Sequence, residues 1–285
     1  MSTLKKLLLI SLALALSFGL VAFVGCESLP QEEIDQIVAG TLNASYDTVS
    51  FEMTIPMSVE VKGGSNPGAM TADSGGNGTM DLTNQAMRMD MSIVMEVPGS
   101  GSQGISAEIY VLDGWMYTGV EISDVGKQWA KMAMTEAMWQ QQNEVDNYIE
   151  LLATAVEVKY KGTETVSGVE CYVFEIEPDM DTLNNLLVSE TSSMGIIDLS
   201  GLDLANLYKE LSVKEWVAKD SYRLQRTEIE MVMEMAPADV GASANDFDKM
   251  VMDIGMTMRF FGYDQPVTIT LPQEALDAEE ITSPY

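Results

Sequence analysis

The chain has 285 residues, 44 acidic side chains against 15 basic ones, and no histidine, so its formal charge at neutral pH is −29. This charge repels nucleic-acid backbones and anionic lipid surfaces. The lack of imidazole excludes Ser-His-Asp triads, Cys-His pairs, HExxH zinc sites and histidine pH switches. The hydrophobic fraction of 46% is that of a globular protein rather than of a disordered acidic tail.

Residues 1–25 are predicted to be a lipoprotein signal peptide. Lys5 and Lys6 form a short basic region, and residues 7–24 then carry no charge. A run of this length also fits an uncleaved N-terminal membrane anchor, which is the alternative. Val24-Gly25-Cys26 favours the signal peptide, because it resembles the bacterial lipobox, in which a small residue precedes the cysteine that becomes lipidated. Phe23 stands where that pattern usually has leucine.

Cleavage before Cys26 would leave residues 26–32 as a lipidated tether and residues 33–285 as a single β-rich domain. Two or more acyl chains hold a protein stably on a bilayer, so we expect a lipid anchor on the extracytoplasmic face of the cell membrane. Cys171 is then the other cysteine of the chain. It lies in a strand-like run, and without a histidine to activate it we expect a small buried side chain rather than a nucleophile.

In the first half of the chain, helical spacing over residues 31–47 changes to strand-like alternation. Asp113-Gly114 is a strong hairpin signal within this half. Small-residue loops are expected at 63–78 and 98–104. Strands are expected at 51–62, 80–97, 105–112, 115–120 and 127–134.

Helical spacing returns over residues 135–156, with Thr135 as the N-cap, and over two shorter pieces at 179–189 and 203–211. Turns are expected near Gly162 and at Asp220-Ser221. The remaining strands are expected at 157–162, 165–177, 213–219, 222–235, 250–260 and 266–271, and the last ten residues are expected to fray. About ten strands in hairpin order, with no linker between them, predict one antiparallel sheet with one dry face.

The chain has 22 methionines, and they gather on the apolar side of successive strands. Side chains two residues apart in a strand point to the same side, so these thioethers are expected to line one surface of the sheet. The candidate ligand-lining residues are Met53, Met57, Met87, Met89, Met91, Met95, Met231, Met233, Met235, Met252, Met256 and Met258.

Three interpretations of this methionine surface compete. Methionine fills irregular gaps in ordinary cores, and its flexible thioether also adapts to apolar ligands in a cavity. Thioethers are, in addition, soft ligands for Cu(I). Copper ranks last, because successive thioethers on one strand lie about 6–7 Å apart and no histidine assists them.

No catalytic set or cofactor site stands out in the sequence. The run that starts at Asp73 resembles a calcium loop, but its twelfth residue is Asn84 where an EF-hand has glutamate. We therefore expect a non-enzyme that needs neither a metal nor a cofactor.

The order of the expected elements and several short sequence segments resemble those of the LolA/LppX-like lipoproteins and of the related bacterial lipoproteins of the DUF6612 type. These segments are Asp113-Gly-Trp-Met-Tyr117, Gln128-Trp-Ala-Lys-Met132, Val166-Ser-Gly-Val-Glu-Cys-Tyr-Val173, Lys214-Glu-Trp-Val-Ala-Lys-Asp-Ser-Tyr-Arg-Leu224 and Gly262-Tyr-Asp-Gln-Pro-Val-Thr-Ile-Thr-Leu-Pro272. The resemblance implies a half-open antiparallel β-barrel with helices packed in its concave face and an apolar cavity between them. It also implies relatives that carry lipids or lipoprotein acyl chains across the cell envelope. A soluble carrier would not keep a lipobox, so the anchored branch is favoured.

The sequence thus favours an α+β, β-rich lipoprotein, anchored to the membrane, that binds an apolar ligand in a methionine-lined concavity. A lipid is the expected ligand, and nucleic acid is not an expected partner. The mechanism would be desolvation of the ligand without chemistry. The alternative is a non-catalytic structural or interaction lipoprotein without a cavity, and a Cu(I)-binding protein is a less favoured one.

Overall fold

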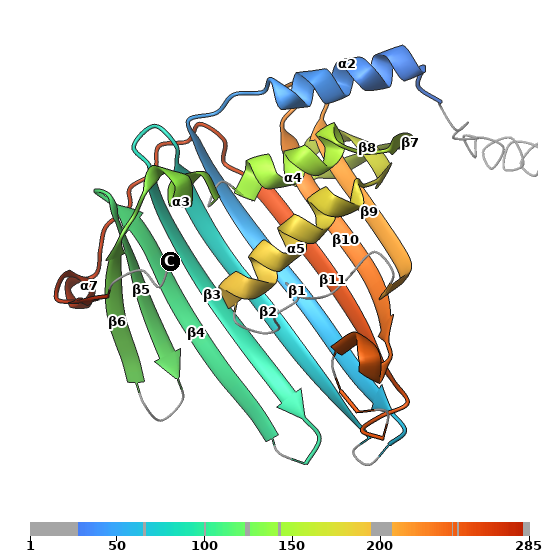
Figure 1. Cartoon of the computed structure of the whole chain (residues 1–285). Coiled ribbons are helices and arrows are strands. Elements are labelled where there is room, and N and C mark those ends of the chain that lie inside the picture. The colour runs from blue at the N-terminus through green and yellow to red at the C-terminus, as the bar shows by residue number, and fades with distance from the viewer. Residues whose placement is uncertain are drawn as a thin grey trace, which may run out of the picture.

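Residues 28–64, 67–99, 101–122, 126–141, 144–194, 207–240, 242–243 and 245–281 are described by the computed structural model of the chain. Most of them lie in one long, curved sheet of twelve strands that does not close on itself (Figure 1). The strands are β1 (Thr48–Lys62), β2 (Gly68–Asp81), β3 (Ala86–Val97), β4 (Gly101–Leu112), β5 (Trp115–Ile122), β6 (Gly126–Ala133), β7 (Glu157–Val166), β8 (Val169–Glu177), β9 (Tyr208–Ala218), β10 (Leu224–Met235), β11 (Lys249–Phe261) and β12 (Glu279–Glu280). This confirms the predicted β-rich, curved and unclosed sheet.

Helical segments separate some of these strands. They are α2 (Gln31–Leu42), α3 (Glu136–Gln141), α4 (Glu144–Ala153), α5 (Met180–Met194) and α7 (Gln273–Leu276), with a short 3-10 turn η1 (Pro237–Val240). The predicted helix over 31–47 ends earlier than expected, and the one over 135–156 forms the two helices α3 and α4.

The strand order is β12-β6-β5-β4-β3-β2-β1-β11-β10-β9-β8-β7. From β1 the chain runs outward through neighbouring strands to β6, then crosses through α3 and α4 to the far edge at β7. It returns through β8, α5, β9 and β10 to β11, which pairs with β1. The short β12 pairs with β6 in parallel, and the other pairs are antiparallel. Helix α4 lies in the connection between β6 and β7, at opposite ends of the sheet, and α5 lies in the connection between the neighbouring strands β8 and β9.

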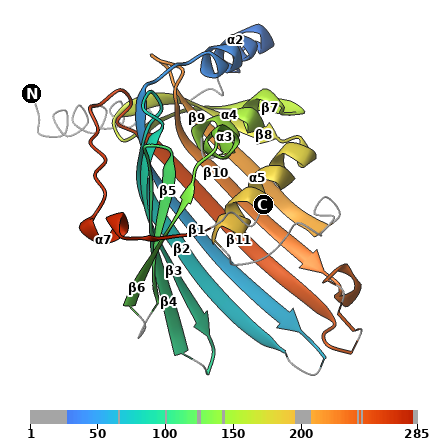
Figure 2. The ribbon, with the colours of Figure 1, turned by 60° about the vertical axis from the view of Figure 1, so that its left-hand side comes forward.

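One face of the sheet carries the apolar side chains. Along β1, Phe51, Met53 and Ile55 are buried while the residues between them are exposed, as a period of two requires. α4 and α5 lie across this side (Figures 1 and 2), and their side chains share one core cluster with it. We call this side of the sheet the helix-covered face. A second, smaller cluster of Val166, Cys171, Val173 and Trp216 forms apart from it.

Strand β2 corrects the loop that was expected over residues 63–78. Glycine and small polar residues there hide the alternation, but the segment pairs with β1 and β3 along its length. Gly78 lies between Phe51 of β1 and Met89 of β3. A side chain at Gly78 would overlap the Phe51 ring, so the glycine makes room for a neighbour's bulk. The loop at 98–104 is likewise shorter than expected, because β4 starts at Gly101.

Gly162 is a bulge rather than the expected turn. It lies inside β7 with φ of +119°, where the register with β8 shifts by one residue. The chain turns instead at Ser167 and Gly168, both of which have positive φ. The hairpin predicted at Asp113-Gly114 is confirmed, with φ of 53° and 76°.

The C-terminal part differs from the sequence prediction in three places. Residues 208–211 belong to β9 and not to a helix, and 203–206 lie outside the described residues. Residues 266–271 alternate but form no strand, because β1 and β10 already occupy both sides of β11. Of the last ten residues, which were expected to fray, Glu279–Glu280 instead form β12 on the β6 edge (Figure 1), and 282–285 lie outside the described residues.

Substitution of Gly78 with alanine should destabilise the fold by about 1–3 kcal/mol. The added Cβ would overlap the Phe51 ring and would lie 2.8 Å from the carbonyl oxygen of Arg88, and backbone yields less readily than a side-chain tip. Urea unfolding measures the change. Gly75→Ala is the matched control, since its Cβ meets a single atom, the Met53 carbonyl oxygen, at 3.3 Å. Equal losses in the two variants would contradict this assignment.

Candidate ligand-binding face

The twelve candidate methionines all lie on the helix-covered face. Met53 of β1 pairs with Met258 of β11 on one side and with Gly76 of β2 on the other. Met233 of β10 pairs with Met252 of β11. The registers therefore join the thioethers of β1, β3, β10 and β11 into one surface, with β2 between β1 and β3.

Eleven of the twelve are buried, with exposed fractions from 0% at Met87 to 9% at Met91, and Met95 is half-buried. Further methionines belong to the same surface: Met80 is fully buried beside Met87, and Met70 of β2, Met116 of β5 and Met250 of β11 are half-buried. Met80 lies in the strand expected over 80–97 and Met250 in the one expected over 250–260, so the spacing within those strands could have identified these two.

Helices α4 and α5 close part of this surface. The Tyr148 hydroxyl of α4 donates a hydrogen bond to Met256 Sδ at 3.1 Å, and its ring centroid lies 6.0 Å from that of Phe260. Leu183 and Leu187 of α5 are almost fully buried in the same cluster. Beneath the helices, therefore, the methionines of β10 and β11 act as core packing.

Apolar side chains on β4 and β5 remain half-exposed on the same face. Ile109 pairs with Met89, and Ala107 pairs with Met91. Val120 of β5 pairs in turn with Ala107. In Figure 1, α5 crosses in front of β10, β11 and β1, whereas no described helix lies in front of the lower parts of β4 and β5. We call the half-exposed side chains of Ile105, Ala107, Ile109 and Val120 the apolar strip.

The strand registers show which residues lie next to the β3 methionines and so test the Cu(I) interpretation. Met89 faces Gly78 and Ile109, and Met91 faces Gly76 and Ala107. Neither thioether has a methionine directly across from it on a neighbouring strand, so β3 does not bring three sulfurs together at these positions. This geometry disfavours a Cu(I) site there.

Glu215 of β9 is a polar exception on the helix-covered face. It pairs with Thr227 of β10 and with Phe174 of β8. Its exposed fraction is 0%, and neither carboxyl oxygen has a hydrogen-bond partner among the described groups. Burial raises the pKa of Glu215 well above its ordinary value. The carboxyl is therefore held in its neutral form over a wide pH range.

Thr227 Oγ1 and Ser74 Oγ are also buried on this face without a hydrogen-bond partner among the described residues. Buried polar groups are normally paired, and each unpaired one costs about 1–3 kcal/mol of stability. Glu215 is not among the site residues predicted from the sequence. Its signal was its place in the alternation Leu211, Val213, Glu215, Val217, in which the other positions are apolar.

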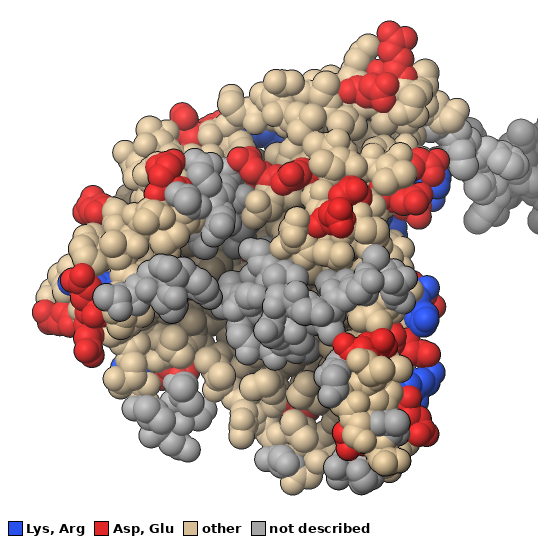
Figure 3. All heavy atoms as spheres, viewed as in Figure 1, with Lys and Arg blue, Asp and Glu red and all other residues tan. Residues whose placement is uncertain are grey.

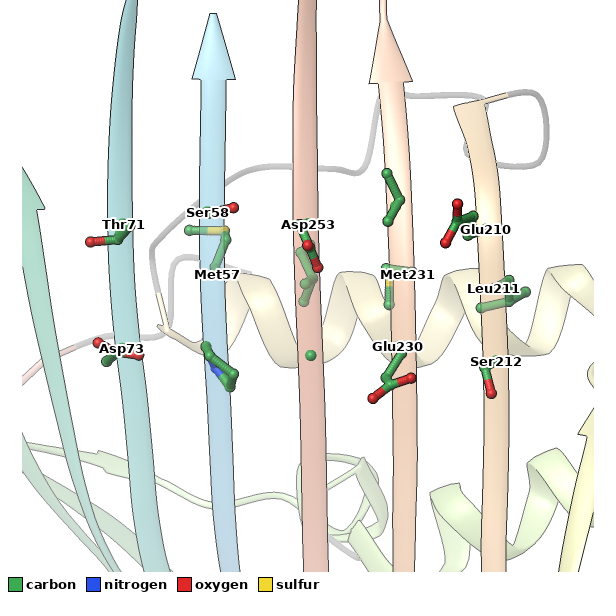
Figure 4. A pocket seen from close by; sticks show the side chains of 14 residues that line it. Met57, Ser58, Thr71, Asp73, Glu210, Leu211, Ser212, Glu230, Met231 and Asp253 are labelled. Atoms are coloured by element: carbon green, nitrogen blue, oxygen red, sulfur yellow. The ribbon is translucent and has the colours of Figure 1, made fainter.

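A hollow of about 750 Å³ lies on the opposite face, over β2, β1, β11, β10 and β9 (Figure 4). Pro56 interrupts the pairing of β1 with β11 there, beside Gly255. In the view of Figure 4, α5 lies behind the strands. Acidic side chains line this hollow: Asp73, Glu210, Glu230 and Asp253. Among the described residues, no three histidine, cysteine or acidic side chains lie close enough to hold a metal ion, so we assign these carboxylates to solvation.

Cys26 and the predicted signal peptide lie outside the described residues. Within the described ranges, no helix combines the length and the apolar character needed to cross a bilayer. Cys171 is free and buried, as expected, and burial raises the pKa of its thiol to about 11. It is therefore a packed side chain rather than a reactive thiolate.

The family model described as "Family of unknown function (DUF6612)" matches residues 33–280, which confirms the resemblance to DUF6612-type proteins. No curated protein matches the chain in sequence.

Among solved structures, the lipoprotein LppX of Mycobacterium tuberculosis is 12% identical, with a TM-score of 0.40 over 85% of this chain and 100% of that one. LprF from Mycobacterium bovis is 13% identical, with a TM-score of 0.42 over 85% of this chain and 98% of that one. A DUF1329 family protein from Desulfovibrio piger is 12% identical, with a TM-score of 0.23 over 84% of this chain and 94% of that one.

Replacing Glu215 with glutamine should change how stability depends on pH. Because the folded-state pKa is raised, the folded chain keeps its proton above the unfolded-state value of about 4.3. Relative to Glu215→Gln, the wild type should therefore lose about 1.4 kcal/mol of unfolding free energy per pH unit as the pH rises from that value to the folded-state pKa. Below about pH 4.3, the difference in unfolding free energy between the wild type and Glu215→Gln should not change with pH. Urea unfolding at a series of pH values measures it, with Glu230→Gln as the exposed control; a pH-independent difference would count against a neutral buried Glu215.

Cys171 should react with a thiol reagent only when the chain unfolds. The thiol is buried and its pKa of about 11 leaves almost no thiolate at neutral pH. Labelling with a chromogenic disulfide in native buffer and in urea tests this, with the Cys26→Ser variant used so that one thiol is counted. Fast labelling of the native chain would contradict the buried assignment.

Proposed function

The chain belongs to the DUF6612 family, and from this premise we propose that it is a membrane-anchored, extracytoplasmic lipoprotein that binds an apolar ligand, a lipid, on the helix-covered side of its sheet. The methionine surface and the apolar strip would line the site. Binding would transfer the ligand's chain from water to this surface without any chemical step.

The observation that carries the proposal is the apolar strip. Ile105, Ala107, Ile109 and Val120 continue the buried methionine surface beyond the helices and stay half-exposed. A contiguous apolar surface that water reaches is a typical binding site for an apolar partner. Burying a chain of about fifteen methylenes at roughly 0.8 kcal/mol each would give a large gross driving force with little selectivity.

The distribution of charge agrees with an apolar binding site on the helix-covered face. In the space-filling view, acidic side chains gather on the helices and around the rim of this side, and the other described atoms in view are mostly uncharged (Figure 3). Ion pairs lie away from the methionines, such as Arg259 with Glu52 and Lys249 with Glu234. An apolar face whose described charged side chains lie at its edges and on the helices supports an apolar ligand rather than a nucleic acid.

The anchor is supported by the N-terminal sequence and by the position of α2. Lys5, Lys6 and the lipobox-like Val24-Gly25-Cys26 precede α2, which begins at Gln31. The few residues between Cys26 and α2 span at most about 15 Å, so a lipid on Cys26 would hold the sheet close to the bilayer surface. Short-range delivery or capture of membrane lipid would follow from that placement.

Replacing Ile109 with glutamate should weaken apolar binding at least tenfold, about 1.4 kcal/mol, because it places a charge in the apolar strip. The full chain, held in an amphipathic polymer, is titrated with the neutral probe N-phenyl-1-naphthylamine. Val94→Glu is the matched control, since Val94 lies on the opposite side of β3 with 41% of its surface exposed. The proposal fails if the wild type does not bind the probe, or if both variants bind it as the wild type does.

Replacing Cys26 with serine should abolish lipidation. In a bacterial host, mass spectrometry should find acyl chains on a wild-type chain that begins at Cys26, and should find no acylation in the variant. The variant should also leave the signal peptide uncleaved, since cleavage in this pathway follows lipidation. A wild-type chain that retains residues 1–25 would establish the uncleaved anchor instead.

A further inference from the structure

A hollow of about 420 Å³ lies between α2 and the sheet, at the end of the sheet where α2 is found (Figure 1). Glu33 and Gln36 of α2 line it, together with Tyr172 of β8 and Tyr222 of the turn between β9 and β10. Ile37 of α2, which is 2% exposed, also lines it. The hollow is separate from the methionine surface and from the apolar strip, because none of their residues takes part in its lining.

Two tyrosines and a carboxylate come together in this hollow. The Tyr222 ring packs against Gly40 of α2, where an added Cβ would lie 2.8 Å from it, and 39% of Tyr222 stays exposed. Burial raises the pKa of Tyr172, and the charges of Tyr222 and Glu33 raise it further, so the three groups lie close to one another. Aromatic rings and carboxylates both attract cations, and sites built from aromatic rings bind quaternary ammonium groups.

Lys219 adds a positive charge beside the hollow. Its Nζ lies 5.5 Å from the centre of the Tyr172 ring, and the residue is not part of the lining. The hollow therefore presents the carboxylates of Glu32 and Glu33 next to a cation. A head that carries an ammonium and a phosphate a few bonds apart has the complementary charges.

The hollow lies close to the predicted site of lipidation. Pro30, which also lines it, comes four residues after Cys26. Four residues span at most about 14 Å. The headgroup layer on each side of a bilayer is about 5–8 Å thick. A lipid on Cys26 would therefore keep the hollow within reach of the heads of neighbouring lipids.

We propose that this hollow binds the zwitterionic head of a phospholipid in the bilayer that holds the anchor. The Glu33 carboxylate and the Tyr222 ring would hold the ammonium group, and Lys219 would pair with the phosphate. This inference rests on the anchor of the proposed function and adds a second site to the apolar one. The second site recognises the head of the lipid, whereas the apolar strip contacts the chain.

A purely anionic head fits this hollow less well. The positive end of the α2 dipole would attract it, but Glu32 and Glu33 in the first turn offset that partial charge. The formal charge of −29 adds long-range repulsion. An anionic head also brings no ammonium group to Glu33 and the Tyr222 ring. The hollow therefore favours zwitterionic over anionic lipids.

The first experiment uses heads without chains, so that the apolar strip does not contribute. Choline, phosphocholine and 3,3-dimethyl-1-butanol, which has the shape of choline without its charge, are titrated by saturation-transfer NMR into the full chain held in a nonionic amphipathic polymer. Choline should bind at least tenfold more tightly than the alcohol, because the ring and carboxylate contacts need the charge. Phosphocholine should bind more tightly than choline, because Lys219 meets its phosphate.

Variants assign the groups of the hollow. Glu33→Gln and Tyr222→Leu should each reduce the preference for choline over the alcohol at least threefold, whereas Tyr222→Phe keeps the ring and should retain it. Lys219→Met should remove the advantage of phosphocholine over choline. Asp35→Asn is the matched control, since Asp35 lies on α2 outside the lining and accepts a hydrogen bond from Gln31. A merely structural role would change the affinities for choline and the alcohol together and leave their ratio as it is.

The second experiment asks whether the head comes from the bilayer. The chain lipidated in a bacterial host is placed in nanodiscs of phosphatidylcholine or of phosphatidylglycerol with the same acyl chains, and hydrogen exchange is measured over residues 31–42. Exchange should be slower in phosphatidylcholine, because a bound head joins α2 to the sheet, and Glu33→Gln should remove this difference.

Equal affinities for choline and the alcohol, or a preference that Glu33→Gln and Tyr222→Leu leave intact, would overturn the site. A preference for choline with equal exchange in the two nanodiscs would overturn the bilayer lipid as the ligand, in favour of a soluble ammonium compound. Neither readout depends on the apolar strip. Both can fail while N-phenyl-1-naphthylamine binds, and binding of that probe can fail while both succeed, so the two proposals are tested separately.

Discussion

The architecture depends on one constraint: a sheet that does not close has an apolar face that something must cover. In a closed barrel the strands themselves shield the interior. Here β7 and β12 end the sheet without meeting, and the face between them is wide. Leaving that face in water would cost about 25 cal/mol for each Å² of apolar surface, so helices, ligand or both must lie on it.

The described helices meet this requirement in part. α4 and α5 seal the region around β10 and β11, where Tyr148 bonds to Met256 and the leucines of α5 are buried. The apolar strip on β4 and β5 has no such cover from them. The course of α5 accounts for the asymmetry, since this helix follows β8 and crosses in front of β10, β11 and β1 (Figure 1). A methionine-rich surface suits a face that helices cover only in part, because the same thioether packs under a helix and adapts to a ligand.

Much of the fold could be predicted from alternation alone. The strands with clear period-two patterns, β1, β3, β10 and β11, and the Asp113-Gly114 hairpin were found because each pattern is local. β2 was missed because its strand character comes from its neighbours: Gly78 is there to accommodate Phe51, and a single sequence does not show that contact. For residues 266–271 the strand prediction was wrong for the opposite reason: their alternation is real, but β1 and β10 already occupy both sides of the preceding strand, β11.

The candidate site, like the fold, could be predicted only where local spacing determines it. The shared face of the methionines could be read from spacing, because strand geometry fixes it. The part of that face that the helices bury could not be predicted, because it depends on how the long connections cross the sheet. Glu215 could have been found from its place between Val213 and Val217, but its lack of a partner is a three-dimensional fact.

The central claim is that this face holds a non-covalent apolar ligand. The most direct measurement is mass spectrometry of the lipids released by organic solvent from the full chain, after mild extraction from its own membrane without added ligand. We expect about one amphiphile per chain, distinct from any acyl chains covalently attached at the proposed lipidation site, Cys26. A chain that releases no lipid beyond that of an equally extracted control membrane protein would contradict it.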